Sequence, residues 1–382
     1  MTRTRILAVT PYYAPEGGGL ERYAHAILSR LVRRGHDVRV LTFTQNGVDG
    51  FQWEGVPVGR MRPRLRLGNA PVHPRFRARV SQAIRSAWPD VVLAHTPVPY
   101  PAEMAYLAAA HSGVPFVVTY HSGRLRGSTP LLDGLASINR ATLERRMIEG
   151  ATGLIAVGPY VRDHALASRR DAVRVIPPGV DVQHFRPGPW PEEPNILFVG
   201  PLSESYRWKG VDVLWDAFER VRRQRPEAVL TLVGSGDRFD ALRERAAGLG
   251  GSIRLLGRVS EDELVREYQR AHLVALPSTT DAESFGMVLA EANACGRPVV
   301  ASRIGGIPDY VREGDNGLLV DAGDPRQLSE AILAVLDDPA QAALMGERGR
   351  QRVLRDHDWD NLTLETENVL LECAHRVEPL VA

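Results

Sequence analysis

Short, strongly apolar runs alternate along this chain with longer segments in which apolar residues recur every three or four positions. The runs are rich in β-branched residues, which is typical of buried parallel strands, whereas the periodic segments predict amphipathic helices. The predicted strands of the first half are 5–10, 37–43, 90–95, 115–121 and 153–158. Those of the second half are 195–200, 228–234, 252–257, 272–278, 297–302 and 317–322. This alternation predicts an α/β fold built from two doubly wound units.

A proline-rich segment separates the two halves. "RPGPWPEEPN", residues 186–195, has four prolines in ten residues, a composition typical of a domain boundary. We therefore expect an N-terminal domain over residues 1–187 and a C-terminal domain over 188–360. The last helical pattern, within 361–382, is expected to pack back on the N-terminal domain.

Composition is that of a globular protein. The 382 residues are 44% hydrophobic and 24% charged, which is ordinary for such a chain. No apolar run has the length of a signal-peptide core or a membrane span, so a cytoplasmic protein is expected. Cys295 and Cys373 lack His or Cys companions at metal-ligand spacing, and we expect neither a metal nor a cofactor.

The net charge of +1 conceals an uneven distribution. Residues 1–185 carry 24 Arg and 13 acids, whereas the remainder carries 23 basic residues and 33 acids. The basic half predicts an anionic contact, such as a membrane surface or an acidic acceptor. The weak overall charge argues against nucleic acid as a partner.

Lysine is almost absent from the chain. Of the 47 basic residues 46 are Arg, and Lys209 in "YRWKG" is the exception. An ammonium is a compact charge that suits a phosphate oxygen, so Lys209 is a candidate phosphate ligand. The alternative is a surface lysine that escaped a compositional drift.

Two glutamates bracket the expected start of a helix in "DAESFGMVLAEANACG". With Phe285 or Gly286 as the first helical residue, Glu283 precedes the helix and Glu291 lies roughly two turns inside. The two glutamates are eight residues apart, about 12 Å along the axis if all residues between them were helical. That span fits a nucleotide sugar, with the diphosphate at the helix N-terminus, Glu283 near the sugar and Glu291 near the ribose. The alternative is an ordinary amphipathic helix. Lys209 and Arg207, in the loop after the first strand of the same half, favour the diphosphate site because they could face it from the other side.

Taken together, these motifs resemble a family. The chain is similar to a retaining glycosyltransferase of family 4, with the GT-B fold of two Rossmann-like domains facing across a cleft, from about Ile6 to Trp359. Besides the glutamate pair, the motifs that carry the resemblance are "PEGGGLERYAHAILSRLVRRGHDVRVLT", "VVTYHSG", "VIPPGVDVQHFRP", "RWKGVDVLWDAF" and "GRPVVASRIGGIPD".

The resemblance implies metal-independent transfer of a sugar from a nucleotide diphosphate donor to an acceptor hydroxyl, with retention of configuration by front-face substitution. It assigns Glu291 to the ribose, Glu283 to the transferred sugar and Lys209 to the diphosphate. The family often has an arginine where this chain has Pro201, and Arg207 is a candidate substitute from a longer loop.

Further donor contacts are expected from both halves. In the N-terminal half, Gly18 and Gly19 of the glycine run 17–19 are candidates for backbone contact with the distal phosphate or sugar, and His121 matches a family histidine that reaches the donor sugar. In the C-terminal half, the backbone of Gly257, Arg258 and Val259 is the candidate base pocket, while Phe285 and Gly286 open the helix that receives the diphosphate.

The acceptor side is marked by a basic stretch. Residues 60–85 carry eight arginines and no acid, and the apolar positions of 75–88 recur at helical spacing. One interpretation is a packed helix with a solvated arginine face. The other is a contact with anionic lipid on the inner face of a membrane, or with a phosphorylated acceptor.

Other functions remain open at this point. A GT-B nucleotide-sugar epimerase, a phosphorylase and a non-catalytic nucleotide-sugar-binding subunit share the donor motifs. A nicotinamide-dependent oxidoreductase is disfavoured because "GGGLER" breaks the G-x-G-x-x-G spacing. The base, the sugar and the acceptor, whether a glycan, a lipid-linked sugar or a small molecule, are not specified by these motifs.

Overall fold

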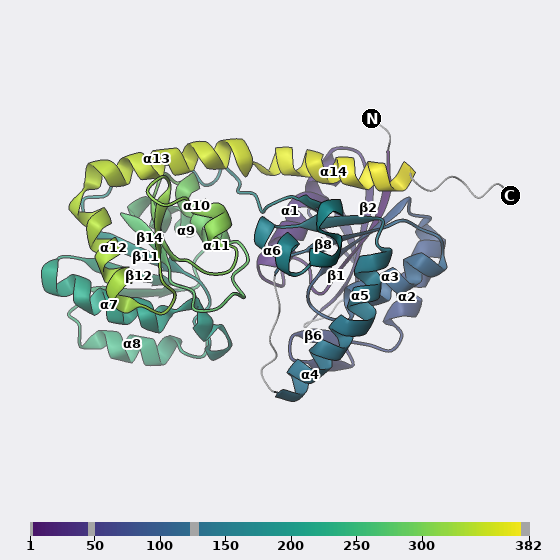
Figure 1. Ribbon diagram of the computed structural model, residues 1–382, viewed down its shortest axis with the longest axis horizontal. Helices are drawn as coiled ribbons and strands as arrows, with labels where there is room; N and C mark the ends of the chain where they lie inside the picture. The colour runs from purple at the N-terminus through teal and green to yellow at the C-terminus, as the bar shows by residue number, and fades with distance from the viewer. Residues whose placement is uncertain (1–2, 45–49, 123–129, 376–382) are drawn as a thin grey trace. The chain divides into compact units, whose positions relative to one another are not determined.

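The computed structural model describes residues 3–44, 50–122 and 130–375. The chain forms two compact units, which are considered separately: an N-terminal unit of residues 1–178 and 359–382, and a C-terminal unit of residues 179–358. In Figure 1 the strands of each unit are surrounded by that unit's helices.

In the N-terminal unit, the described residues form an eight-stranded sheet of order β10-β9-β8-β7-β1-β2-β4-β3. Its pairs are parallel except β3 with β4. Its strands are β1 Arg5–Thr10, β2 Asp37–Phe43, β3 Phe51–Trp53, β4 Val56–Met61, β7 Val91–Thr96, β8 Phe116–Tyr120, β9 Gly153–Ala156 and β10 Val173–Val175, and a separate hairpin pairs β5 Leu65–Leu67 with β6 Ala70–Val72.

Helices connect these strands. They are α1 Gly19–Arg33, α2 Phe76–Ala87, α3 Pro101–His111, α4 Pro130–Asn139, the π-helix η1 Arg140–Glu144, α5 Arg145–Gly150, α6 Pro159–His164 and the 3₁₀ segment η2 Ala167–Ala172. The last helix, α14 Trp359–His375, packs against α1, where Arg34 and His36 hold its Glu367.

The C-terminal unit has a six-stranded parallel sheet of order β13-β12-β11-β14-β15-β16 within the described residues. Its strands are β11 Asn195–Val199, β12 Val229–Val233, β13 Ile253–Gly257, β14 Leu273–Leu276, β15 Val299–Ser302 and β16 Gly317–Val320. Its helical segments are η3 Glu204–Lys209, α7 Val211–Gln224, α8 Phe239–Ala247, α9 Glu261–Arg270, α10 Met287–Ala294, α11 Ile307–Tyr310, α12 Pro325–Asp337 and α13 Pro339–Asp356.

Burial explains why the apolar runs form these sheets. All residues of β7, β8, β12 and β14 are buried, as expected for parallel strands covered by helices on both faces. The doubly wound α/β architecture is therefore confirmed. The strands absent from the sequence prediction, β3 to β6 and β10, are short or incompletely buried, so their composition carries little apolar signal.

The division between the units differs from the expected boundary at 187/188. The change lies at Pro178–Gly179 and the chain returns to the N-terminal unit at Trp359 rather than after residue 360. The residues just before the expected boundary belong to the C-terminal unit because Arg350 donates to the carbonyls of Val182 and Phe185. In the proline-rich segment itself, the almost fully buried Arg297 donates to the carbonyls of Gly188 and Pro189. The proline-rich segment is thus packed onto the C-terminal unit.

Candidate functional site

Lys209 is the last residue of η3, in the loop that joins β11 to α7. Gly210 follows with φ +78°, and a Cβ there would lie 1.9 Å from the carbonyl oxygen of Pro277. Only glycine fits such a close approach with that backbone angle. The Lys-Gly pair of "RWKG" therefore brings η3 against the end of β14.

Lys209 and Glu283 form an ion pair in the C-terminal unit. The distance from Lys209 Nζ to Glu283 Oε2 is 2.6 Å, and the two side chains are 18% and 9% exposed. Ser278 Oγ donates a second hydrogen bond to the same carboxylate oxygen at 3.1 Å. The ammonium also lies 4.6 Å from the centroid of the Trp208 ring, in cation–π range. The ammonium is thus held at a fixed place beside the loop that precedes α10.

The Glu283 backbone is held by the "RIGGIPD" loop. Gly306 N donates to the Glu283 carbonyl at 2.9 Å, and a Cβ on Gly306 would lie 1.8 Å from the Ser284 carbonyl oxygen. The double glycine lets one backbone rest directly on the other. Glu283 is consequently rigid at both its side chain and its main chain.

Helix α10 begins at Met287, and Gly286 caps it with a left-handed φ of +77°. Glu291 is the fifth helical residue, so it lies about 6 Å beyond the first one. The expected helix start at Phe285 or Gly286 was wrong, so Glu291 lies little more than one turn inside the helix rather than two. Glu291 is buried and accepts a hydrogen bond from Tyr268 at 2.7 Å.

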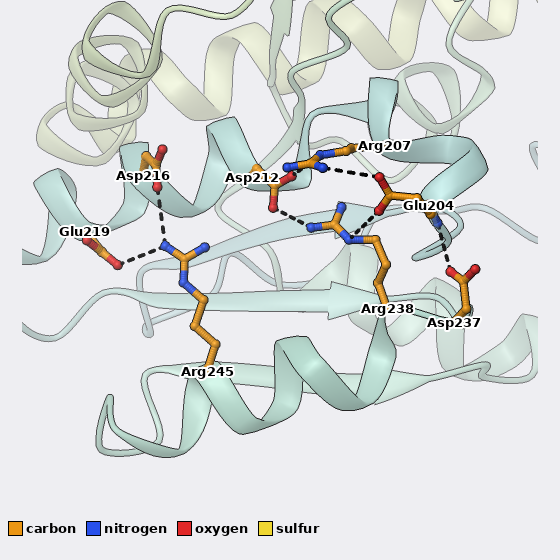
Figure 2. Close-up of polar contacts among 8 residues, drawn as sticks. All are labelled: Glu204, Arg207, Asp212, Asp216, Glu219, Asp237, Arg238 and Arg245. Carbon is orange, nitrogen blue, oxygen red and sulfur yellow. Dashed lines mark hydrogen bonds and ion pairs between the residues drawn. The ribbon is translucent and has the colours of Figure 1, made fainter. Parts of the chain in front are cut away.

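Arg207 lies in an exposed charged network (Figure 2). Its guanidinium donates to Asp212 at 3.1 Å and to Glu204 at 3.2 Å, and its side chain is 62% exposed. Among the described residues these carboxylates are its ion-pair partners. The structure therefore groups Arg207 with the start of α7 and not with Lys209 and Glu283.

The remaining donor candidates of this unit fall into two groups. Gly257 ends β13 with φ +69°, Arg258 is exposed and Val259 is half-buried, so this turn offers its backbone at the carboxyl end of the sheet. Phe285 is buried and its ring centroid lies 5.1 Å from that of Tyr310. The Phe285 side chain is thus part of the core.

His121 belongs to the N-terminal unit, directly after β8. Its Nε2 lies 2.9 Å from Nδ1 of the buried His95, and its ring packs against Tyr23 with 4.8 Å between centroids. Burial lowers the pKa of His95 to about 3. Burial and the neighbouring His95 hold the pKa of His121 well below its usual value. Both rings are therefore neutral at neutral pH.

The tautomers of this neutral pair follow from the surroundings of His95. His95 Nε2 is buried without a hydrogen-bond partner among the described residues, and a buried N–H without a partner costs more than a bare lone pair. The His95 proton therefore lies on Nδ1 and is donated to His121 Nε2. His121 then carries its own proton on Nδ1, where it acts as a donor.

We expect the stability of this unit to fall below pH 6.5 because of His95. Its pKa of about 3 in the folded state is below the unfolded value of about 6.5, so only the unfolded chain gains a proton as the pH falls through 6.5. The stabilisation is complete above pH 6.5 and declines toward pH 3 by up to about 1.4 kcal/mol per pH unit. Denaturant unfolding of the wild type and His95→Gln between pH 7 and pH 5 measures this effect. The difference between their free energies of unfolding is expected to narrow as the pH falls, and a difference that stays constant would contradict the lowered pKa of His95.

The glycine run precedes α1, whose first turn is capped by Glu21. Gly18 N donates to Glu21 Oε2 at 2.7 Å, and burial raises the pKa of the Glu21 carboxyl. Gly19 is the first helical residue. A phosphate at this loop would therefore share the Gly18 amide with a carboxyl group of the protein itself.

The sequence analysis did not identify the residues whose hydrogen bonds hold the predicted site residues in place. Tyr268 and His95 each contact a predicted site residue from another element, and Ser278 contacts Glu283 within the loop between β14 and α10. Ser278 and His95 had a detectable signal, because each is polar and lies at or just after the end of a buried strand. Tyr268 had none, since it lies on the apolar face of α9.

Comparison with known proteins places each half in a family. The model of glycosyltransferase family 4 matches residues 17–184, and that of glycosyl transferases group 1 matches residues 181–352. A glycogen synthase of Mycobacterium tuberculosis is 31% identical, over 96% of this chain and 94% of that protein. A GDP-mannose-dependent alpha-(1-6)-phosphatidylinositol monomannoside mannosyltransferase of the same species is 29% identical, over 96% and 98%.

Solved structures show the same fold. The Anabaena protein HepE in complex with UDP superposes with a TM-score of 0.78 at 21% identity, covering 96% of this chain and all of that one. Sucrose-phosphate synthase from Thermosynechococcus elongatus gives a TM-score of 0.76 at 23% identity, covering 96% and 98%. Together with the family matches, these likenesses confirm the expected fold and family: the chain is a hexosyltransferase that belongs to glycosyltransferase family 4 and has the GT-B fold.

Proposed function

We propose that this enzyme transfers a hexosyl group from a nucleoside diphosphate sugar to an acceptor hydroxyl, without a metal and with retention of anomeric configuration. The observation that carries the proposal is the Lys209–Glu283 ion pair of 2.6 Å, next to the N-terminus of α10 and one turn before Glu291. A cation and a helix N-terminus are the groups that bind a diphosphate. The names of several relatives, including the UDP complex of HepE, agree with such a donor.

Each residue has a proposed role. Lys209 and the amides at the start of α10 bind the diphosphate, and they bind it more strongly as the sugar bond breaks and the leaving group gains charge. Glu283 accepts a hydrogen bond from the transferred sugar and Glu291 from the ribose hydroxyls, while the Gly257–Val259 backbone contacts the base. In the other unit, His121 donates to a sugar hydroxyl and the Gly18 and Gly19 amides contact the distal phosphate.

The chemical step follows from these roles. The bond from the anomeric carbon to the diphosphate oxygen breaks, and the acceptor oxygen bonds to the same face of that carbon. The departing phosphate oxygen takes the acceptor proton, so the protein supplies no general base. Because the acceptor oxygen attacks the anomeric carbon directly, the protein supplies no nucleophile either.

The test is turnover of glucose and mannose donors of uridine, guanosine and adenosine diphosphates, followed by nucleotide release and NMR of the sugar product. We expect one donor to release its nucleoside diphosphate, more rapidly with an acceptor, to give an α-linked product from an α-linked donor, and to react equally fast in EDTA. A donor that is isomerised without release of its nucleotide would indicate an epimerase. A reaction that depends on inorganic phosphate would indicate a phosphorylase, and donor binding without turnover would indicate a non-catalytic subunit.

We further propose that the N-terminal unit contacts a bilayer of anionic lipid, such as the inner face of the cytoplasmic membrane. In the β5–β6 hairpin, Arg64, Leu65, Arg66 and Leu67 are all exposed, with Leu65 at 55% and Leu67 at 40%. Arginines that alternate with exposed leucines suit an interface where headgroups are anionic and the acyl boundary is apolar.

Helix α4 extends this surface. A Cβ on Gly68, at the hairpin turn, would lie 3.8 Å from Leu132 of α4. One and two turns further along, Leu135 is 44% and Ile138 64% exposed. Exposed apolar side chains gathered in this way mark an interaction site. In the part of the chain that the structure describes, no helix is long and apolar enough to span a bilayer.

If this surface contacts the bilayer, replacing the exposed leucines of the β5–β6 hairpin should weaken vesicle binding. Leu65→Ser/Leu67→Ser is expected to weaken binding to phosphatidylglycerol vesicles about tenfold, because apolar area no longer enters the interface. The matched control is Leu344→Ser, which changes a leucine 46% exposed in the C-terminal unit. Flotation with phosphatidylglycerol and phosphatidylcholine vesicles measures the effect, and equal binding by both variants would exclude this surface.

A further inference from the structure

The segment that ends in Lys209 is irregular and needs support from outside. η3 has 3₁₀ geometry over Glu204–Lys209, with non-helical angles at Tyr206. It thus consists of two short 3₁₀ turns, whose hydrogen bonds are few and poorly aligned, and no residue of the segment is buried. Its conformation therefore depends on contacts with neighbouring elements.

The loop between β12 and α8 supplies backbone contacts. Leu202 N donates to the Ser235 carbonyl at 3.0 Å, and Arg238 N donates to the Leu202 carbonyl at 3.0 Å. Glu204 N donates to the side chain of Asp237 at 2.8 Å. These bonds hold the start of η3, five residues before Lys209.

At the other end of η3, Thr279 N donates to the Trp208 carbonyl at 2.7 Å. Charged side chains add further support (Figure 2). Arg238 Nη2 donates to Asp212 Oδ1 at 2.6 Å, and Arg238 Nε lies 3.6 Å from Glu204. Asp212, in the first turn of α7, also accepts from Arg207. Asp212 thus joins both arginines, one from η3 and one from the loop before α8.

This network is more than a single surface pair. The Arg238 side chain is 19% exposed and that of Asp212 31%, so water screens their charges only in part. Partial burial by itself would raise the pKa of Asp212, but hydrogen bonding and charge from Arg238 outweigh it, and the pKa lies below its usual value. The carboxylate is therefore charged wherever the enzyme would work.

We infer that Asp212 and Arg238 are positioning residues, which hold η3 so that Lys209 faces Glu283. The orientation of Lys209 depends on contacts within the C-terminal unit. The effect of that orientation on a bound diphosphate rests on the proposed function. Arg207 belongs to the same charged network, in which it links Asp212 to Glu204.

The single lysine makes this orientation directly measurable. Acetic anhydride modifies lysine amines, and mass spectrometry separates acetylated Lys209 from the acetylated chain terminus. In the wild type the ion pair with Glu283 protects the amine. Arg238→Gln and Asp212→Asn are each expected to raise the Lys209 acetylation rate severalfold in protein whose circular dichroism stays native.

Arg245→Gln is the matched control. Arg245 lies on α8, the helix that follows Arg238, and likewise reaches carboxylates of α7, at 3.4 Å from both Asp216 and Glu219, but it makes no bond to η3 among the described residues. We expect its acetylation rate to equal that of the wild type. Equal rates in all four proteins, or an equal rise in Arg245→Gln and Arg238→Gln, would overturn the inference whether or not any nucleotide binds.

Donor turnover provides the second measurement. Arg238→Gln is expected to lower kcat/KM about tenfold in the wild type and to have no further effect in Lys209→Ala, because both changes remove one interaction. Effects that multiply would overturn the inference. A lack of donor turnover in the wild type would instead contradict the proposed function, while the acetylation rates would still decide on the positioning.

Discussion

Replacing Lys209 with alanine is expected to lower kcat/KM for the nucleotide sugar by about 10²–10³-fold, the usual effect of removing one preorganised charge from a transition state. The loss arises because the leaving diphosphate gains negative charge as the sugar bond breaks, and the ammonium is held 2.6 Å from Glu283, at the proposed diphosphate site. Steady-state kinetics measure it, with the larger part of the change expected in kcat.

The same substitution leaves the carboxylate of Glu283, 9% exposed, without its charged partner, so stability has to be controlled. Loss of one member of a buried pair is costly. Lys209→Met/Glu283→Gln removes both charges and is expected to recover stability without recovering turnover. Turnover within about threefold of the wild type in Lys209→Ala would show that the lysine plays no part in the chemistry.

Glu291→Gln is the change with the next largest expected effect. A charged hydrogen bond contributes about 1.5–3 kcal/mol, so losing the carboxylate is expected to weaken nucleotide binding about 10- to 100-fold. Because Glu291 is proposed to accept from the ribose hydroxyls, the wild type should prefer the ribonucleoside diphosphate to its 2′-deoxy form. The variant should lose this preference, which calorimetry with both nucleotides measures.

Tyr268→Phe distinguishes direct contact with the ribose from support of the Glu291 side chain. The Tyr268 hydroxyl donates to Glu291 at 2.7 Å and has no proposed contact with the ribose. This variant is expected to keep the preference for ribose while losing less affinity than Glu291→Gln. A preference for ribose that survives in Glu291→Gln would assign the ribose to another residue.

Much of the fold could be predicted because burial on both faces leaves a plain pattern. β7 and β12 are buried throughout and mostly apolar, which is typical of parallel strands covered on both faces. The short strands β5 and β10 are not buried, so their residues are under no such constraint. The unit boundary escaped prediction because prolines favour a linker in general, whereas here Val180 and Val182, which precede the prolines, are buried in the core of the C-terminal unit.

Site residues could be predicted where they follow strands, since ligands of open α/β sheets bind at those ends. Lys209 was singled out as the only lysine and Glu283 by its place before a helix, and both lie in loops that follow strands, where the structure joins them in an ion pair. The depth of Glu291 was wrong because one backbone angle, at Gly286, decides where α10 begins. The contact of Tyr268 with Glu291 depends on packing between separate elements, which no local pattern encodes, whereas His95 carried the strand-end signal and was missed.

The measurement that tests the central claim most directly is a thermal-shift panel of the mono- and diphosphates of uridine, guanosine and adenosine, with the wild type and Lys209→Ala. A ligand that binds the folded state alone raises Tm by mass action. We predict that the diphosphate of one base raises the wild-type Tm well above the effect of its monophosphate, and that this difference disappears in Lys209→Ala. Equal shifts by mono- and diphosphate in the wild type, or no shift with any nucleotide, would contradict a diphosphate site built on Lys209.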